Sequence, residues 1–169
     1  MWWLLKKAIK SKPWLPTTKG FKPPGEAWVN SQANRDLFKD DIAYTNIEIP
    51  SNIRELIGIN ISGTNENILS YLLTLSKSGR KPKKNEIIHL YKRLDDSAPD
   101  ELEEAFGANP LIYCPDEKVW KKSNEVFWEN VSILDANSFP SLMENFADIK
   151  WAHGFFVDKI GVPESVDFD

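Results

Sequence analysis

The chain has 169 residues, of which 41% are hydrophobic and 27% charged, so its composition is that of an ordinary folded protein with one domain or two small ones. Its one cysteine, Cys114, excludes an internal disulfide, and because only His89 and His153 accompany it, a Cys/His zinc site is excluded as well. The 21 basic and 25 acidic residues give a net charge of −4, which is not the charge of a dedicated nucleic-acid-binding protein.

The first part of the sequence predicts short elements separated by prolines and glycines. Apolar residues in 2–12 recur with helical spacing, and Pro13 stops that helix. The elements expected in this part are a helix over 2–12, extended segments around a turn at Lys19-Gly20, a helix from a cap at Asn30-Ser31 to about Phe38, a strand over 44–49 and a short helix from Pro50-Ser51 to Gly58.

The second part predicts longer helices and one pair of strands. Thr64 caps the first of these helices and Gly79 ends it. The expected elements are helices over 65–78, 84–95 and 99–107, strands over 111–113 and 125–128 around a polar turn at 116–118, and helices over about 139–150 and 151–160. Together the two parts predict an α+β fold, mainly helical, with two short Trp-bearing β-hairpins.

The sequence also resembles itself at a spacing of about one hundred residues, as a repeat would. Trp28 and Trp128 lie 100 positions apart, and Gly58 and Gly161, each within an apolar tripeptide, lie 103 positions apart. Two further pairs of landmarks keep the same order, namely Trp14-Leu15-Pro16 with Tyr113-Cys114-Pro115 and Leu37-Phe38 with Ile133-Leu134. We expect an internal duplication that relates residues 14–59 to 113–162, and the alternative is coincidence in a Trp-rich chain.

The duplication predicts three segments. Residues 1–13 form an N-terminal helix at the junction to a missing upstream region, 14–107 are the first copy with its trailing helices, and 108–169 are a second, truncated copy. A repeat without its neighbour leaves apolar surface open. We therefore expect exposed patches near Phe155, Phe156 and Val162 and near Trp2 and Trp3, and weak self-association through them.

The chain resembles the region downstream of the ATPase in large sacsin-like and NO VEIN-like proteins. The resemblance covers residues 12–165 and is carried by aromatic and glycine positions. These are Lys12-Pro13-Trp14-Leu15-Pro16, Trp28-Val29, Leu56-Ile57-Gly58-Ile59, Leu111-Ile112-Tyr113-Cys114-Pro115, Trp120, Glu125-Val126-Phe127-Trp128 and Phe155-Phe156-Val157-Asp158-Lys159-Ile160-Gly161-Val162.

The resemblance implies a non-catalytic segment of a larger protein that carries a histidine-kinase-like ATPase. That ATPase holds its nucleotide with an Asn-x-x-x-Asp helix motif and an Asp-x-Gly-x-Gly loop, and neither motif occurs in this sequence. A Gly-rich phosphate loop is absent too, so we expect no binding of ATP with magnesium. The expected partners are other domains of the parent protein and protein clients, with no cofactor and no metal ion.

Basic and aromatic residues supply the candidate interaction surface. Cations cluster in 77–84 between two expected helices, where they form either a solvated loop or, together with Lys121-Lys122, a contact for nucleic acid. The residues of the expected surface are Trp2, Trp3, Arg80, Lys81, Lys83, Lys84, Phe155 and Phe156.

No catalytic group is predicted by the remaining titratable residues. His89 and His153 have no partner in the sequence pattern that would make either a general base, and Cys114 is expected to be a buried structural thiol. Most of the tryptophans are expected in the core. Because the apolar start Met1–Leu5 stops at Lys6 and no apolar run approaches ~20 residues, the sequence predicts a cytoplasmic protein without a membrane span.

Overall fold

The computed structural model describes residues 2–129 and 139–165 and has an α+β fold, mainly helical, with small two-stranded sheets. The chain divides into two compact units, Met1–Thr64 (unit 1) and Asn65–Asp169 (unit 2). This division differs from the expected boundary between residues 107 and 108. It places the helices that follow residue 64 with the second unit, instead of leaving them as a trailing part of the first.

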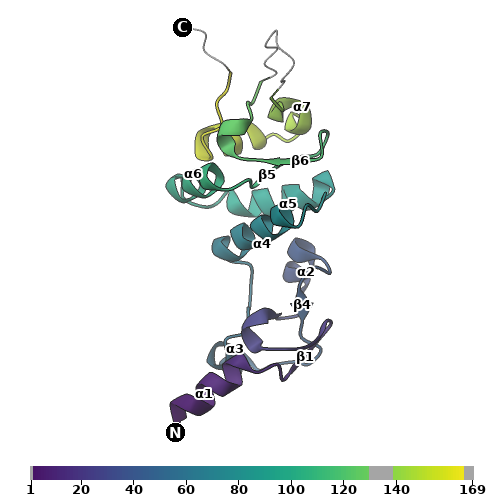
Figure 1. Cartoon of the computed structure of the whole chain (residues 1–169), viewed down its shortest axis with the longest axis vertical. Coiled ribbons are helices and arrows are strands. Elements are labelled where there is room, and N and C mark those ends of the chain that lie inside the picture. Colours follow the sequence, from purple (N-terminus) through teal and green to yellow (C-terminus); the bar gives the residue numbers. More distant parts are fainter. Residues whose placement is uncertain (1, 130–138, 166–169) are drawn as a thin grey trace. The chain divides into compact units, whose positions relative to one another are not determined.

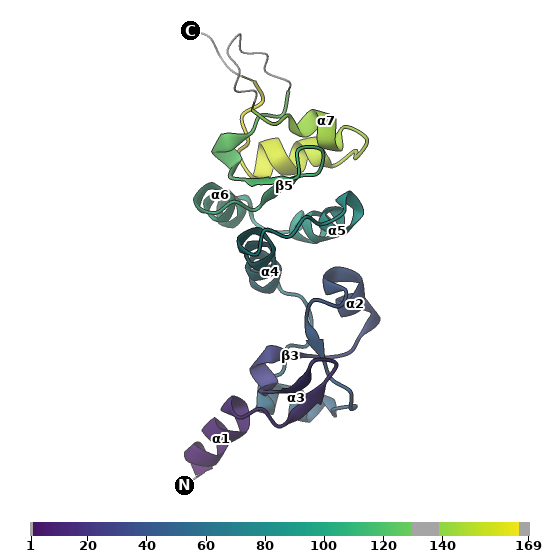
Figure 2. The same ribbon diagram turned by 45° about the vertical axis from the view of Figure 1, so that its right-hand side comes forward.

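Unit 1 begins with a helix and a β-hairpin. Helix α1 (Trp2–Ser11) lies at one end of the unit, and strands β1 (Leu15–Thr17) and β2 (Gly20–Lys22) follow as an antiparallel pair (Figures 1 and 2). A two-residue turn joins the strands, and Gly20 after it has φ +83°, a left-handed conformation that costs glycine little. The predicted turn at Lys19-Gly20 is confirmed to within one residue.

A parallel strand pair forms the middle of unit 1. After the 3-10 turn η1 (Pro24–Glu26), strand β3 (Ala27–Trp28) pairs with β4 (Ala43–Tyr44), and the helix α2 (Gln32–Phe38) makes the connection between them. Ser31 caps α2 as predicted, since its hydroxyl accepts a hydrogen bond from the amide of Asn34 at 3.2 Å. The expected strand over 44–49 is reduced to β4, because its partner β3 is equally short.

The end of unit 1 returns to β3. Helix α3 (Ser51–Ile57) ends at Gly58, whose φ of +77° is the left-handed conformation of a helix C-cap. Asn60 then forms a parallel β-bridge with Trp28. The amide of Val29 donates to the carbonyl oxygen of Asn60 at 2.9 Å. The buried apolar cluster of this unit consists of Leu15, Ala27, Ile49, Ile57 and Ile59, with Ile9 and Val29 packed against it.

Unit 2 opens with three helices whose bounds lie close to the predicted ones. They are α4 (Asn65–Lys77), α5 (Lys84–Leu94) and α6 (Pro99–Ala108). Each presents one apolar stripe to the core, as the helical spacing of its apolar residues predicts. Leu72 of α4, Tyr91 of α5 and Phe106 of α6 are fully buried.

The hairpin of unit 2 is formed by β5 (Ile112–Cys114) and β6 (Val119–Lys121), which pair antiparallel across a four-residue turn. The expectation that 125–128 forms the second strand of this hairpin is wrong. Glu125 ends the 3-10 turn η2 (Ser123–Glu125), and Phe127 forms a parallel bridge with Ser141 instead. The register of β5 with β6 is fixed by the turn, whereas the position of Phe127 depends on a partner far along the chain.

The last helices of unit 2 are shorter than expected. They are α7 (Leu142–Phe146) and the π-helical segment η3 (Gly154–Lys159), and the hairpin lies close to both in the ribbon views. The core here is aromatic, with Tyr91 at its centre. The rings of Phe106, Phe146, Phe155 and Phe156 lie with their centroids 5.4–6.3 Å from that of Tyr91.

Candidate functional site

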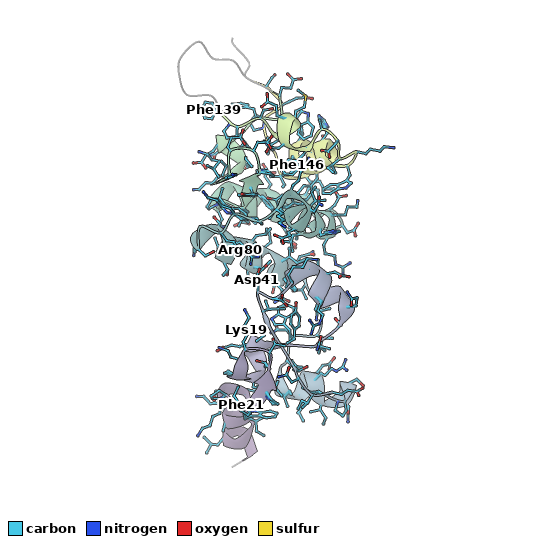
Figure 3. All side chains as sticks on the ribbon, turned by 90° about the vertical axis from the view of Figure 1, so that its right-hand side faces the viewer. Lys19, Phe21, Asp41, Arg80, Phe139 and Phe146 are labelled. Carbon is cyan, nitrogen blue, oxygen red and sulfur yellow. The ribbon has the colours of Figure 1, made fainter. Side chains whose placement is uncertain are left out.

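The basic segment between α4 and α5 is anchored to the rest of unit 2 (Figure 3 labels Arg80). The carbonyl oxygen of Arg80 accepts a hydrogen bond from Nε1 of Trp120 at 2.8 Å, and Pro82 is buried. Of the predicted cations, Lys81 and Lys83 are exposed. The segment is therefore held in one place while these two ammonium groups remain open to solvent.

Lys84 is engaged within unit 2 and is not a free cation. Its Nζ lies 2.6 Å from Oδ1 of Asp148 and 5.8 Å from the ring centroid of Phe146, which Figure 3 labels. The hydrogen bond from Lys84 lowers the pKa of the exposed Asp148 carboxyl below its ordinary value. Lys84 thus connects the start of α5 with the end of α7.

The hairpin brings a second basic segment beside the first. Trp120 is the middle residue of β6, and Lys121 and Lys122 follow it, both half-buried. The hydrogen bond from Trp120 to Arg80 joins positions 40 residues apart in the sequence. The structure therefore joins β6 to the α4–α5 connection at Trp120.

The expected exposed patch at Phe155 and Phe156 is wrong. Both side chains are fully buried, and Val162 is buried as well. The physical reason is that α5 and α6, which the expected duplication gives to the first copy, pack on the second: the ring centroid of Phe155 lies 5.7 Å from that of Tyr91 and 6.2 Å from that of Phe106. These two phenylalanines form core and not an interaction surface.

The tryptophans divide between core and surface. Trp28 and Trp128 are buried, as expected, and Trp120 is half-buried against the ring of Tyr113 at 5.0 Å. Trp14 is exposed, contrary to the expectation for a repeated position, although its Nε1 donates to the carbonyl oxygen of Ile9. Trp2 and Trp3 belong to α1, but their side chains lie outside the described part of the chain, so their surface role stays a prediction.

The candidate titratable groups lie on different elements, and burial shifts the pKa values of two of them. Burial raises the pKa of the Cys114 thiol to about 12, in agreement with the expected buried thiol, and burial raises the pKa of Tyr44 to about 12. His89 is exposed on α5, whereas His153 packs its ring on Trp128 at 5.1 Å. Tyr44 belongs to unit 1, and Cys114, His89 and His153 lie on separate elements of unit 2.

Sequence reasoning missed a hollow in unit 1 with a volume of about 340 Å³. It lies beside the ends of β3 and β4 and the middle of α3. Its walls are Val29, Asn30, Thr45, Asn46, Ile47, Glu48, Ile49 and Arg54. No motif marks these residues, because they come from three elements that are brought together only by the pairing of β3 with β4 and Asn60.

Large apolar side chains are exposed on unit 1, and sequence reasoning did not single them out. Phe21, labelled in Figure 3, is 67% exposed in β2. It lies directly across the hairpin from the half-buried Pro16. The others are Leu4, Trp14, Ile47, Ile53, Leu56 and Ile61. Of the described residues of unit 1, Phe21 is the most exposed of these apolar side chains.

Two other kinds of site are missing from the part of the chain that the structure describes. Within residues 2–129 and 139–165, no three His, Cys, Asp or Glu side chains are grouped so as to hold a metal ion. None of the helices described is both long and apolar enough to traverse a bilayer. Comparison with protein families, curated proteins and solved structures finds no match for this chain.

Proposed function

We propose that the chain is a non-catalytic scaffold or protein-interaction segment of a larger, ATPase-linked, chaperone-like protein of the cytoplasm. The observation that carries the proposal is that Phe21 is exposed, whereas Trp120, which we take as the corresponding residue of unit 2, is half-buried. The comparison of the two positions depends on the internal duplication, which we propose as part of the same interpretation.

The backbone supports the duplication through the order of its hydrogen bonds. Each unit has an antiparallel hairpin, followed by a 3-10 turn and then by a residue that pairs in parallel with a later segment. In unit 1 this pair is Trp28 with Tyr44, and in unit 2 it is Phe127 with Ser141. The next amide along, of Val29 or Trp128, donates to a carbonyl oxygen near the end of the unit at 2.9 Å. In both units that acceptor follows a glycine with φ +77°.

The side chains support the same pairing of positions. Trp28 packs on Phe38 with ring centroids 4.7 Å apart, and Phe127 packs on Phe139 at 5.3 Å. The backbone and the rings thus favour Phe127, and not Trp128, as the counterpart of Trp28. The register that we propose therefore differs by one residue from the one that aligns the two tryptophans, and it keeps the pairing of Gly58 with Gly161. Ile133-Leu134 lies outside the described residues.

In this register Phe21 of β2 corresponds to Trp120 of β6. Trp120 is half-buried because the α4–α5 connection lies against it, with the carbonyl oxygen of Arg80 as hydrogen-bond acceptor. Phe21 stays exposed among the described residues. An exposed aromatic side chain on a hairpin is a usual anchor for a protein partner, since burying it removes a large apolar area from water.

The test is a labelling experiment on a longer chain that includes the region encoded upstream of Met1. We expect that region to carry the Asn-x-x-x-Asp and Asp-x-Gly-x-Gly motifs of the ATPase. A Phe21→Cys thiol should react at least about tenfold more slowly with a maleimide in the longer chain than in the present one, since a buried thiol is inert. Asn52→Cys, at an exposed position of α3, is the control and should react equally in both. Equal rates at position 21, or an upstream region without the motifs, would contradict the proposal.

The second candidate is contact with nucleic acid, and the Trp120–Arg80 hydrogen bond is the observation that favours it. That bond holds β6, which ends at Lys121, against the segment that carries the exposed Lys81 and Lys83. The overall net charge of −4 opposes this function. Binding to a single-stranded oligonucleotide that weakens with salt and is lost in Lys81→Glu/Lys83→Glu would support it, whereas the scaffold predicts no salt-dependent binding.

A further inference from the structure

The hollow of unit 1 is lined by both polar and apolar residues. Val29, Ile47 and Ile49 supply the apolar walls, and Asn30, Asn46 and Glu48 supply polar groups at its border. Its volume of about 340 Å³ lies at the low end of the roughly 300–1,000 Å³ typical of sites for small ligands. It has room for one large side chain.

Arg54 has a fixed position in the wall of the hollow. It lies in the middle of α3, is half-buried, and donates from Nε to the carbonyl oxygen of Ile49 at 2.8 Å. This bond orients the planar guanidinium group before any ligand arrives. A held guanidinium plane stacks well on aromatic rings and loses little conformational freedom when it does so.

Unit 2 indicates what kind of group fits this place. In the pairing proposed above, Val29 corresponds to Trp128. The amide of Val29 donates to the carbonyl oxygen of Asn60, and the amide of Trp128 donates to that of Pro163. The indole of Trp128 is 8% exposed and packs on His153 and Phe156. Where unit 2 carries an indole, unit 1 carries an isopropyl group.

The segments around Val29 in unit 1 also fill less space than those around Trp128 in unit 2. In unit 2 the chain after Ser141 enters α7 at once, and Phe146 of α7 packs on Phe156 with centroids 5.1 Å apart. In unit 1 the chain after β4 runs through Asn46–Ile49 without a helix before α3 begins at Ser51. The smaller side chain and the plain connecting segment together leave the hollow in unit 1.

We propose that the hollow of unit 1 binds an aromatic side chain presented by a partner polypeptide, with the ring between Val29 and Ile49 and stacked on the guanidinium of Arg54. The presence of a partner rests on the proposed function. The choice of an aromatic group rests on the proposed correspondence of Val29 with Trp128, whereas binding of such a group to the hollow can be measured without any partner. The two are therefore tested separately.

The probe is N-acetyl-tryptophanamide, titrated into the isotopically labelled full chain and followed by NMR. We expect saturable shifts of the Val29, Ile47 and Ile49 methyl groups with a dissociation constant of roughly 1 mM, a usual value for one side chain. N-acetyl-leucinamide should bind at least about threefold more weakly because it lacks the ring that stacks on Arg54. Absence of saturation, or equal binding of the two amides, would overturn the proposal.

Val29→Trp is the decisive variant, since it fills the hollow from inside as Trp128 fills unit 2. It should weaken N-acetyl-tryptophanamide binding at least about tenfold, whereas Ile61→Trp, which adds an exposed indole outside the hollow, should leave binding unchanged. Ile47→Asp alters an exposed wall residue that folding tolerates and should weaken binding at least about threefold. Binding unaffected by both Val29→Trp and Ile47→Asp would place the ligand elsewhere and refute the assignment. If the probe binds while position 21 proves open in the longer chain, the proposed function fails and this inference stands.

Discussion

The hydroxyl of Tyr91 accepts a hydrogen bond from the backbone amide of Tyr113 at 2.8 Å, and it donates one to the carbonyl oxygen of Leu111 at the same distance. Helix α5 is thereby joined to strand β5 at a point that is fully buried. Burial raises the pKa of Tyr91 far above its ordinary value, so the phenol stays protonated and keeps both roles. The bond also explains why α5 belongs to unit 2.

Tyr91→Phe should lower the free energy of unfolding by roughly 1–3 kcal/mol, because it leaves the Tyr113 amide and the Leu111 carbonyl buried without this partner. The measurement is chemical denaturation followed by circular dichroism. His89→Ala, at an exposed position of the same helix, is the control and should change the value by less than about 0.5 kcal/mol. Equal stability of Tyr91→Phe and the original chain would show that the buried bond contributes nothing.

Asp95 should make the stability of unit 2 depend on acid. Burial alone would raise its pKa, but hydrogen bonds from Lys92 at 2.9 Å and from Lys159 at 3.1 Å outweigh burial and lower it. A lowered pKa in the folded state stabilises the fold above the ordinary aspartate value of ~4, and this contribution is lost as the pH falls through the lowered value.

Asp95→Asn should therefore cost roughly 1–2 kcal/mol at pH 7 and progressively less below about pH 4. Urea unfolding at a series of pH values gives the difference directly. Asp96→Asn, at the exposed neighbouring position, serves as the control. A difference between Asp95→Asn and the original chain that stays constant from pH 7 to pH 2 would mean that the two lysines do not stabilise the carboxylate.

Two glycines of unit 2 should respond in opposite directions to alanine. Gly161 has φ +77°, so Gly161→Ala should cost about 1–2 kcal/mol through backbone strain, the nearest atoms being those of the flexible Glu103 side chain. Gly107 lies in α6, where an added Cβ would meet only Ser123 Oγ at 3.8 Å, so Gly107→Ala should stabilise by roughly 0.5 kcal/mol. Thermal unfolding of the two variants measures both changes in stability. If both variants were stabilised, or both destabilised, the prediction of opposite effects would be wrong.

Cys114 should report the opening of unit 2. Its thiol is fully buried and has its pKa raised to about 12, so at pH 8 iodoacetamide should modify it at least about a hundredfold more slowly than it modifies free cysteine. The rate should rise with subdenaturing urea as the hairpin opens. Mass spectrometry of the intact chain measures it, and rapid labelling in buffer would show that the strand is open already.

Local signals predicted the helices well. Ser31 caps α2, Gly58 ends α3 and Gly79 follows α4 because each of these features depends on a few neighbouring residues. The strand pairs were predicted poorly. Phe127 pairs with Ser141 and β3 with β4, and nothing within either short segment specifies such a distant partner.

Which residues are exposed and which line the hollow could be learned only from the tertiary structure. The burial of Phe155 could not be foreseen, since the sequence does not state which core α5 and α6 cover. The sequence alone aligns Trp28 with Trp128 because identical residues dominate an alignment, whereas the duplication proposed above aligns Trp28 with Phe127. A shift of one residue in a strand turns every side chain to the opposite face, so the first alignment does not suggest the proposed correspondence of Val29 with Trp128.

The position of Phe155 and Phe156 near the end of unit 2 has a consequence for synthesis on the ribosome. Helices α5 and α6 emerge first, and the two rings that cover Tyr91 and Phe106 follow about fifty residues later. At roughly 5–20 residues per second, the apolar faces of these helices wait several seconds for their covering. Exposed apolar surface of this kind is prone to aggregation, and slow codons after Phe106 would lengthen its exposure.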